Sequence, residues 1–213
     1  MIIAIDGPAA AGKGTLARRL GERLGFALLD TGLLYRAVGM KCLAAGADPG
    51  DETAATAIAR DLHTADLDTP GLRGDEAANA ASKVAVIPGV RAALLDFQRQ
   101  FAAYPPGREP GAVLDGRDIG TVVCPGADVK LFVTASAEVR AQRRVKELRE
   151  RGLDAIYARV LQDMKERDAR DSSRAVAPLA PADDAVVLDT SDLDADAVFE
   201  AAMRIVTSRN REG

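Results

Sequence analysis

Short apolar runs alternate with longer helical patterns along the 213 residues. The runs end at polar or glycine residues and predict five strands, at residues 2–5, 26–29, 111–114, 129–133 and 185–188. Between them, apolar residues recur at helical spacing, as at Leu16, Leu20 and Leu24. We predict helices from about Lys13 to Gly25, from Thr31 as N-cap through Leu43, and at residues 52–63, 89–103, 136–150, 154–170 and 195–207.

Apolar strands that do not alternate, separated by helices, are typical of a parallel sheet with both faces covered. We therefore predict an α/β fold with a five-stranded, doubly wound parallel sheet. Ligands of such folds bind beyond the carboxyl ends of the strands. Asp6, Asp30, Asp115 and Asp189 follow four of the predicted strands. Aspartate is also a common turn former and cap, and we interpret Asp189 as a cap.

A phosphate-binding loop is the strongest motif in the chain. Residues 7–15 fit the pattern G-x4-G-K directly after a strand and before a helix, which is the context that this motif requires. The residues are Gly7, Pro8, Ala9, Ala10, Ala11, Gly12, Lys13, Gly14 and Thr15. Lys13 can reach two phosphates and Thr15 can donate its hydroxyl. Gly14 stands where the pattern has a magnesium-binding Ser or Thr, so the metal must be held mostly by phosphates and waters. The alternative for the whole motif is a capped helix after a glycine turn.

Two further clusters follow the second and third predicted strands. Thr31 and Tyr35 share a helix face, and Arg36 beside them offers a bidentate fork for a phosphate; a core tyrosine and a solvated arginine would explain them equally. In the other cluster, Asp115 can organise the waters of Mg²⁺ beside the phosphate loop. Arg117 and Asp118 add a donor and an acceptor, which a plain turn would not require.

Arginine is concentrated between residues 138 and 174, which hold nine of the 22 arginines and a net charge of +3. Arg167, Arg170 and Arg174 share one helical stripe, and Arg140, Arg143 and Arg144 form another. Unpaired arginines would repel unless anions lie opposite. Two such helices joined near residues 151–152 predict a hinged flap that this repulsion holds open until nucleotides bind. The alternative is a surface helix neutralised by Asp168 and Asp171.

Composition excludes several classes of protein. Hydrophobic residues at 47% suffice for a core, which excludes a disordered tail. A net charge of −4 argues against a nucleic-acid polymer as partner, and no apolar run approaches the roughly 18 residues of a membrane span. Two lone cysteines, Cys42 and Cys124, and a start without a signal-peptide pattern predict a cytoplasmic protein. We expect a monomer.

General-base chemistry is not expected either. His63 is the only histidine, and we place it at the surface. A phosphate monoester is already mostly a dianion at pH 7, so an acceptor phosphate needs no base to become a nucleophile. Positioning and charge neutralisation are then sufficient for phosphoryl transfer.

Taken together, the motifs resemble those of bacterial cytidylate kinases, a branch of the P-loop nucleoside monophosphate kinases. The match is carried by the phosphate loop, LDTGLLYR at 29–36, NAAS at 79–82 with PGVR at 88–91, DGRDIGT at 115–121 and ERDARDSSRAVAPL at 166–179. The resemblance implies an adenylate-kinase-like fold that transfers a phosphoryl group from ATP, with Mg²⁺, to CMP or dCMP. It implies one domain with a core at 1–63, 85–145 and 160–213, a monophosphate-binding insertion at about 64–84, shorter than in most members, and an arginine-rich lid at about 146–159.

The resemblance also implies roles for individual residues. ATP would bind residues 7–15 with Arg140 and Arg144, and Mg²⁺ would lie near Asp115, through water, and Thr15. The implied acceptor side comprises Thr31, Tyr35, Arg36, Arg73, Ser82, Arg91, Arg117, Asp118, Arg167 and Asp171. The implied catalytic cations are Lys13, Arg117, Arg167, Arg170 and Arg174.

Among the acceptor-side residues, Ser82, Arg91 and Asp118 would read cytosine, whose N4 amino group suits a carboxylate while uracil would present an acceptor there. Another acceptor, such as AMP or UMP, is the alternative. A GTP-switched binding module is a weaker one, because no N-K-x-D guanine motif is present.

Overall fold

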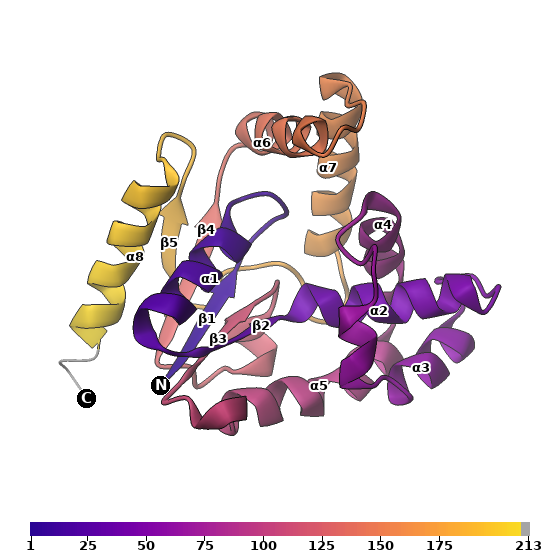
Figure 1. Ribbon diagram of the computed structural model, residues 1–213, viewed down its shortest axis with the longest axis horizontal. Helices are drawn as coiled ribbons and strands as arrows, with labels where there is room; N and C mark the ends of the chain where they lie inside the picture. Colours follow the sequence, from indigo (N-terminus) through magenta and orange to yellow (C-terminus); the bar gives the residue numbers. More distant parts are fainter. Residues whose placement is uncertain (210–213) are drawn as a thin grey trace.

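A computed structural model describes residues 1–209, and its centre is a five-stranded parallel sheet in the order β2-β3-β1-β4-β5 (Figure 1). The strands are β1 (Ile2–Asp6), β2 (Ala27–Asp30), β3 (Ala112–Asp115), β4 (Val129–Thr134) and β5 (Val186–Asp189). All four pairings are parallel, with Ile5 of β1 opposite Asp115 of β3 and Leu131 of β4. The predicted sheet is therefore confirmed. The strand-end aspartates are the last residues of their strands and do not follow them; they are Asp6, Asp30, Asp115 and Asp189.

Helices cover both faces of the sheet. The long helices are α1 (Lys13–Leu24), α2 (Thr31–Ala44), α3 (Glu52–Arg60), α4 (Asp75–Val84), α5 (Pro88–Ala103), α6 (Ala137–Glu150), α7 (Tyr157–Ser172) and α8 (Ala195–Arg209). Shorter pieces are the 3₁₀ turns η1 (Thr64–Asp68) and η2 (Pro106–Arg108), and the π-helix η3 (Ile119–Val123).

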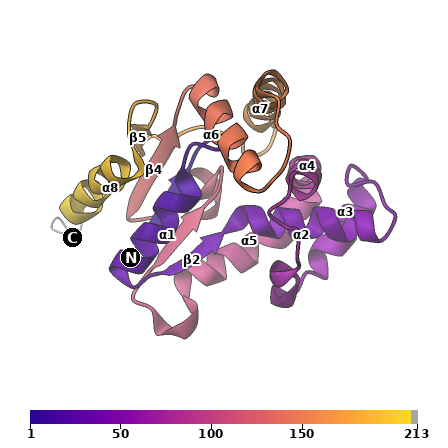
Figure 2. The same cartoon turned by 45° about the horizontal axis from the view of Figure 1, so that its top comes forward.

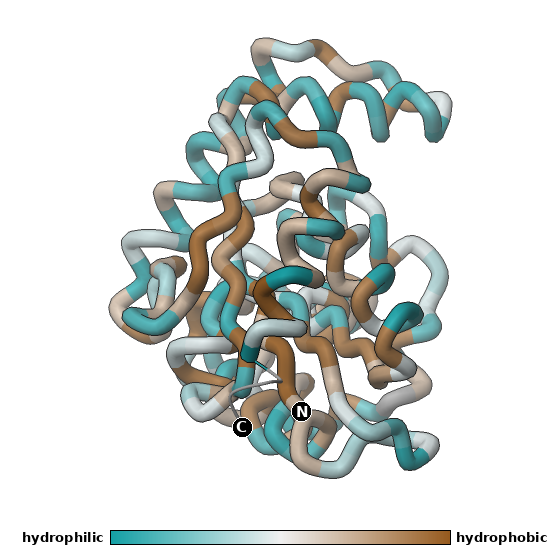
Figure 3. Tube along the Cα trace, turned by 90° about the vertical axis from the view of Figure 1, so that its left-hand side faces the viewer, coloured by the Kyte–Doolittle hydropathy of each residue, from teal (hydrophilic) through white to brown (hydrophobic). Residues whose placement is uncertain are grey.

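Alternate residues of β1 enter two different hydrophobic layers. Ile3 and Ile5 pack with α1 and α8, whereas Ala4 faces α5 and η3. In the hydropathy colouring, the strands are brown, hydrophobic stretches of the tube through the middle of the molecule (Figure 3). Because a parallel strand buried on both sides needs apolar residues at every position, this arrangement explains the short unbroken apolar runs.

A separate helical subdomain is built from α2, α3, α4 and α5 (Figure 2). Helix α4 was not among the predicted helices, because its sequence DEAANAASKV contains only alanine and one valine as apolar residues. Its alanines lie against α2, where Gly39 has no side chain; a Cβ at Gly39 would come within 2.7 Å of the Ala80 Cβ. Small residues on both helices therefore allow a close approach that the hydrophobic pattern alone does not reveal.

Helices α6 and α7 form a hairpin above the carboxyl edge of the sheet (Figure 1). Helix α7 begins at Tyr157, three residues later than predicted, after a turn in which Gly152 has a positive φ of 75°. The N-cap of α2 is Asp30 and not Thr31 as predicted, since Thr31 already has helical backbone geometry. Among residues 1–209, no helix is long and apolar enough to cross a membrane.

Candidate active site

The phosphate loop has the backbone geometry of an anion cradle. Gly7, Ala10 and Gly12 all have positive φ values, of 144°, 58° and 95°. A Cβ at Gly7 would overlap the carbonyl oxygen of Val133, so this position accepts only glycine. Gly12 is the N-cap of α1 and has no side chain to cap the helix. The first amide groups of α1 therefore remain available to an anion, with the positive end of the helix dipole behind them.

Lys13 is held inside this loop as a buried cation. Its Nζ donates to the Pro8 carbonyl at 3.1 Å and lies 3.7 Å from Asp115 Oδ1. Burial and then the nearby Arg117 lower the pKa of Lys13 to about 8, while Asp115 opposes the shift. Two arginines, Arg117 and Arg167, and two carboxylates, Asp115 and Asp30, surround Lys13, so burial is the main reason that its charged form is disfavoured. A phosphate beside Nζ would favour that form.

Two cavities meet at Lys13. The larger, of about 690 Å³, follows the phosphate loop and the start of α1, and its wall includes Arg18, Arg73 and Arg143. The smaller, of about 200 Å³, lies between α2, α4 and the carboxyl ends of β2 and β3. Lys13 and Asp115 line both cavities. A group that spans the two spaces would thus pass directly over the lysine.

Nine of the ten residues predicted for the acceptor side line the smaller cavity. They are Thr31, Tyr35, Arg36, Ser82, Arg91, Arg117, Asp118, Arg167 and Asp171. Arg73 is the exception: its exposed side chain lies on the wall of the larger cavity, 3.5 Å from Asp30. The Thr31 hydroxyl donates to the Asp115 carbonyl at 2.8 Å, and Arg36 donates to the Leu72 carbonyl at 2.8 Å. Asp30 was not predicted as a site residue although it lines both cavities, and its place at a strand end was the only signal.

One end of the smaller cavity is a buried recognition cluster. Arg91 donates through Nη2 to Asp118 Oδ2 and through Nη1 to the Ala85 carbonyl at 3.2 Å. Its guanidinium lies over the Tyr35 ring, 5.6 Å from the centroid. The Ser82 hydroxyl is buried in the cavity wall, and no hydrogen-bond partner for it occurs among residues 1–209. A buried hydroxyl without a partner is costly unless a ligand supplies one, so this end of the cavity is suited to a polar ring.

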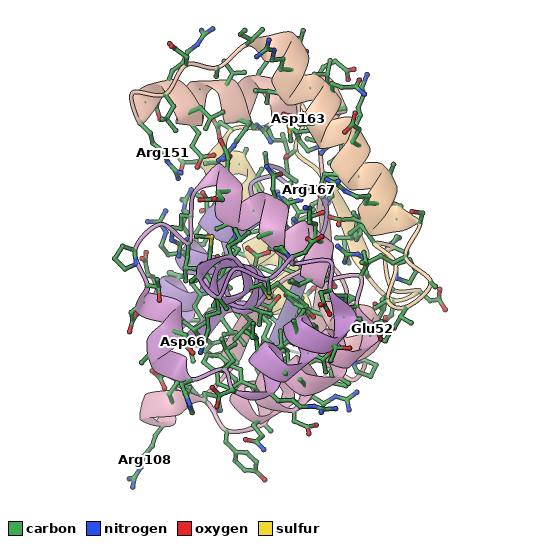
Figure 4. All side chains as sticks on the ribbon, turned by 90° about the vertical axis from the view of Figure 1, so that its right-hand side faces the viewer. Glu52, Asp66, Arg108, Arg151, Asp163 and Arg167 are labelled. Atoms are coloured by element: carbon green, nitrogen blue, oxygen red, sulfur yellow. The ribbon has the colours of Figure 1, made fainter. Side chains whose placement is uncertain are left out.

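A second cluster in the wall of the same cavity consists of arginines around a single carboxylate. Asp171, whose side chain is 1% exposed, pairs with Arg174, with Arg117 at 3.2 Å and with Arg167 at 4.0 Å. Within the described part of the chain, the Nε atoms of Arg167 and Arg174 have no hydrogen-bond partner. Burial and the neighbouring Arg117 lower the pKa of Arg167 to about 10. Three guanidinium groups around one carboxylate leave an excess of about two positive charges, which favours a bound anion. Figure 4 shows Arg167 beneath the hairpin, toward the body of the molecule.

Three other predicted arginines are placed differently. Arg170 is exposed and lines neither cavity, because it lies on the outer side of α7. Arg140 is buried: its Nε donates to the Ala135 carbonyl, and its Nη atoms hold both oxygens of Asp168 and the Ala9 carbonyl. Arg144 pairs with Asp75 and with Glu147. Asp168 and Asp171 do neutralise arginines of the chain, namely Arg140 and Arg174, so that part of the alternative is confirmed. The other part, a surface helix, does not hold for Asp171, which is buried in the cavity wall.

The α6–α7 hairpin contacts the first residue of α4 and the segment just before it. Arg144 of α6 pairs with Asp75, and Arg151 donates to the Arg73 carbonyl at 3.0 Å. Repulsion between arginines was expected to hold the hairpin away. It does not, because carboxylates of this chain, such as Glu147 between Arg144 and Arg151, neutralise them.

The surroundings of the loop fit a magnesium ion held mainly by phosphates and water. No group of three or more His, Cys, Asp or Glu side chains suitable for a metal occurs in the described part of the chain. The Asp115 carboxylate lies beside Gly14, where an added Cβ would be 3.4 Å from Oδ2. Thr15 lines the same cavity. One carboxylate and one hydroxyl beside a phosphate cradle match the usual manner of binding Mg²⁺, in which the ion keeps several waters.

Comparisons with known proteins agree on one family. The model of the cytidylate kinase family matches residues 3–208. The cytidylate kinase of Paramagnetospirillum magneticum is 71% identical over 208 residues, which cover 98% of each chain. That of Rhodospirillum rubrum is 63% identical over 212 residues and covers 100% of each.

Solved structures add support for the fold alone. An uncharacterized protein from Eubacterium ventriosum aligns over 99% of this chain and 98% of its own, with 15% identity and a TM-score of 0.52. The extent and identity of the sequence matches show that this chain belongs to the cytidylate kinase family.

Proposed function

We propose that this chain transfers a phosphoryl group from ATP to CMP or dCMP, the reaction for which its family is named. The observation that carries the proposal is the junction of two cavities at Lys13 and Asp115. ATP would lie along the phosphate loop and the monophosphate in the smaller cavity. The two reacting phosphates would then meet above Lys13, in line with each other.

Catalysis in this arrangement rests on position and charge. The acceptor phosphate is a dianion at neutral pH and attacks without a general base. Arg117, Arg167 and Arg174 would orient it and offset the repulsion between the two polyanions, since Asp171 neutralises only part of their charge. Lys13 would neutralise charge as the phosphoryl group moves. Asp115, through water, and Thr15 would hold Mg²⁺ together with the phosphates, and the ion would supply neutralisation of the phosphate charge.

Base selection would come from the cluster of Arg91, Asp118 and Ser82. Asp118 Oδ2 accepts from Arg91, and its second oxygen can accept from the cytosine N4 amino group. Arg91 and the unpaired Ser82 hydroxyl can donate to O2 and N3. Uracil would place its O4 against the buried Asp118 carboxylate, an arrangement that costs far more than a lost hydrogen bond.

The α6–α7 hairpin, with residues 146–159 at its tip, would act as the lid over these sites, and residues 64–84 as the insertion beside the monophosphate. A cavity of 200 Å³ is smaller than the about 300–1,000 Å³ of common ligand pockets, so a nucleotide must widen it. Arg140 would support the phosphate loop through the Ala9 carbonyl. Arg143 lies on the larger cavity wall and donates to the Thr190 hydroxyl at 2.9 Å, so it would reach the donor phosphates only after leaving Thr190. Arg144 would do so only after leaving Asp75 and Glu147.

A panel of acceptors tests the proposal. The pure protein with Mg-ATP is given CMP, dCMP, UMP, AMP or GMP, and ADP formation is followed. We expect CMP and dCMP to give the highest kcat/KM. Fastest turnover of AMP or GMP would contradict the assignment of the base-reading residues, and binding of GTP but not ATP in a thermal-shift experiment would favour a nucleotide-switched module.

A further inference from the structure

Asp6 is a buried carboxylate to which the mechanism above gives no task. It ends β1, directly before the phosphate loop. Its two oxygens accept from consecutive backbone amides, Oδ1 from Ile119 at 2.8 Å and Oδ2 from Gly120 at 2.7 Å. These amides belong to the first two residues of η3. Asp6 therefore caps the start of a short helix that lies 113 residues away in the sequence.

The N-cap position of that helix belongs to Asp118, which makes no capping hydrogen bond with its side chain. An N-cap aspartate ordinarily accepts from the amides of its own helix. Here the Asp118 carboxylate turns into the smaller cavity and accepts from Arg91. The Asp6 carboxylate thus accepts from the helix amides, which leaves the Asp118 carboxylate in the wall of the smaller cavity.

We propose that Asp6 is a positioning residue for base recognition, which caps η3 in place of Asp118 and so keeps the Asp118 carboxylate pointed at Arg91 and the pyrimidine. The inference rests on the proposed function, because Asp118 has a base to read only if the acceptor is a pyrimidine nucleotide. When the cap from β1 is lost, the free amides of Ile119 and Gly120 compete for the carboxylate of Asp118. The discrimination between cytosine and uracil then weakens.

The packing around Asp6 leaves little space for a substitute. A Cβ at Gly120 would come within 3.4 Å of Asp6 Oδ2 and 3.1 Å of the Lys130 side chain. Burial raises the pKa of Asp6 to about 6, while the two amides lower it, Asp118 raises it and Lys13 lowers it. Cys124 directly follows η3, and burial first and then Asp6 raise the pKa of its thiol, while Arg99 lowers it. Lys130 directs its amino group away, to Asp184 at 2.8 Å.

The test compares the ratio of kcat/KM for CMP to kcat/KM for UMP in the unaltered protein, two variants of Asp6 and one control variant. Asp6→Ala removes both acceptors, and we expect the ratio to fall about tenfold or more. Asp6→Asn keeps one oxygen, and its ratio is expected between those of the unaltered protein and Asp6→Ala. The matched control is Asp128→Asn, because Asp128 also holds β1 through a backbone amide, that of Ile2 at 2.6 Å, but lies at the exposed far end of the strand. A ratio in Asp6→Ala within about twofold of the unaltered protein would overturn the inference.

The unaltered protein provides a second test that needs no variant to fold. Asp6 is ionised above pH 6 and protonated below it, so the CMP/UMP ratio should fall as the pH is lowered through about 6. The phosphates of CMP and UMP titrate alike and cancel in the ratio. A flat ratio would count against Asp6, and a pH dependence that persists unchanged in Asp6→Asn would overturn the inference. If the unaltered protein prefers UMP, the proposed function fails; if it prefers CMP and the variants keep that preference, only this inference fails.

Discussion

The balance of charge around Asp171 gives the most specific prediction about the site. Asp171→Asn keeps the size and one acceptor oxygen of the side chain but removes its charge. Arg117, Arg167 and Arg174 then lose the one carboxylate that pairs with all three of them. Removing one partner of a buried ion pair costs about 3–5 kcal/mol. The asparagine retains some hydrogen bonding, so we expect the lower end, about 3 kcal/mol.

That loss is measurable by thermal unfolding. For a domain of this size about 1 kcal/mol corresponds to roughly 2–4 °C, so Tm should fall by about 6–12 °C. Inorganic phosphate should raise the Tm of Asp171→Asn more than that of the unaltered protein, because an anion can replace the missing carboxylate. Asp163→Asn is the control, since Asp163 is exposed on the same helix and its removal should cost less than about 0.5 kcal/mol (Figure 4). A Tm for Asp171→Asn within about 2 °C of the unaltered protein, or no added effect of phosphate, would refute the reasoning.

Two further predictions concern the phosphate loop. Lys13 has a pKa near 8 because burial disfavours its charge, and a bound phosphate should raise that pKa. ATP binding at pH 8.5 should therefore take up a proton. At pH 6.5 Lys13 is already charged, so binding should take up no proton through this group. Calorimetry in two buffers of different ionisation enthalpy measures the uptake, and equal heats in both buffers at pH 8.5 would contradict this. Gly7→Ala should abolish ATP binding, because its Cβ would overlap the Val133 carbonyl. The control is Gly126→Ala, whose Cβ meets no described atom within 4 Å and which should bind ATP normally. Isothermal titration of both variants measures this, and normal binding by Gly7→Ala would be inconsistent with the loop geometry.

The sheet and the phosphate loop could be predicted from sequence because each depends on local physics. Ile2 to Ile5 are apolar at every position, which is what burial on both faces requires. Two glycines of the loop, Gly7 and Gly12, stand where φ is positive, so the sequence itself marks these two turns of the backbone. Such features need no knowledge of distant contacts.

Features that depend on distant partners were not predictable in the same way. Arg140 has the sequence setting of a phosphate ligand, but Asp168 of α7 and the Ala9 carbonyl occupy its Nη atoms. Arg170 follows the helical stripe of Arg167, yet one step of three residues turns it out to solvent. Helix α4 packs through alanines against Gly39, so no hydrophobic stripe marks it. In each case the deciding contact comes from another element.

The position of Asp6 is a further example of this difference. In the sequence, Asp6 is one of several aspartates at strand ends, a position that is typical of a turn-forming residue. Only the approach of η3 to the end of β1 reveals that it accepts from two amides beyond Asp118.

The central claim is that one crevice holds a pyrimidine monophosphate and ATP with their phosphates facing across Lys13. A crystal structure with CMP and Mg-ADP tests it most directly. We expect the cytosine amino group within hydrogen-bonding distance of Asp118, the CMP phosphate against Arg117 and Arg167, and the ADP phosphates on residues 7–15. A pyrimidine bound elsewhere, or these arginines turned to solvent with both nucleotides present, would contradict the account.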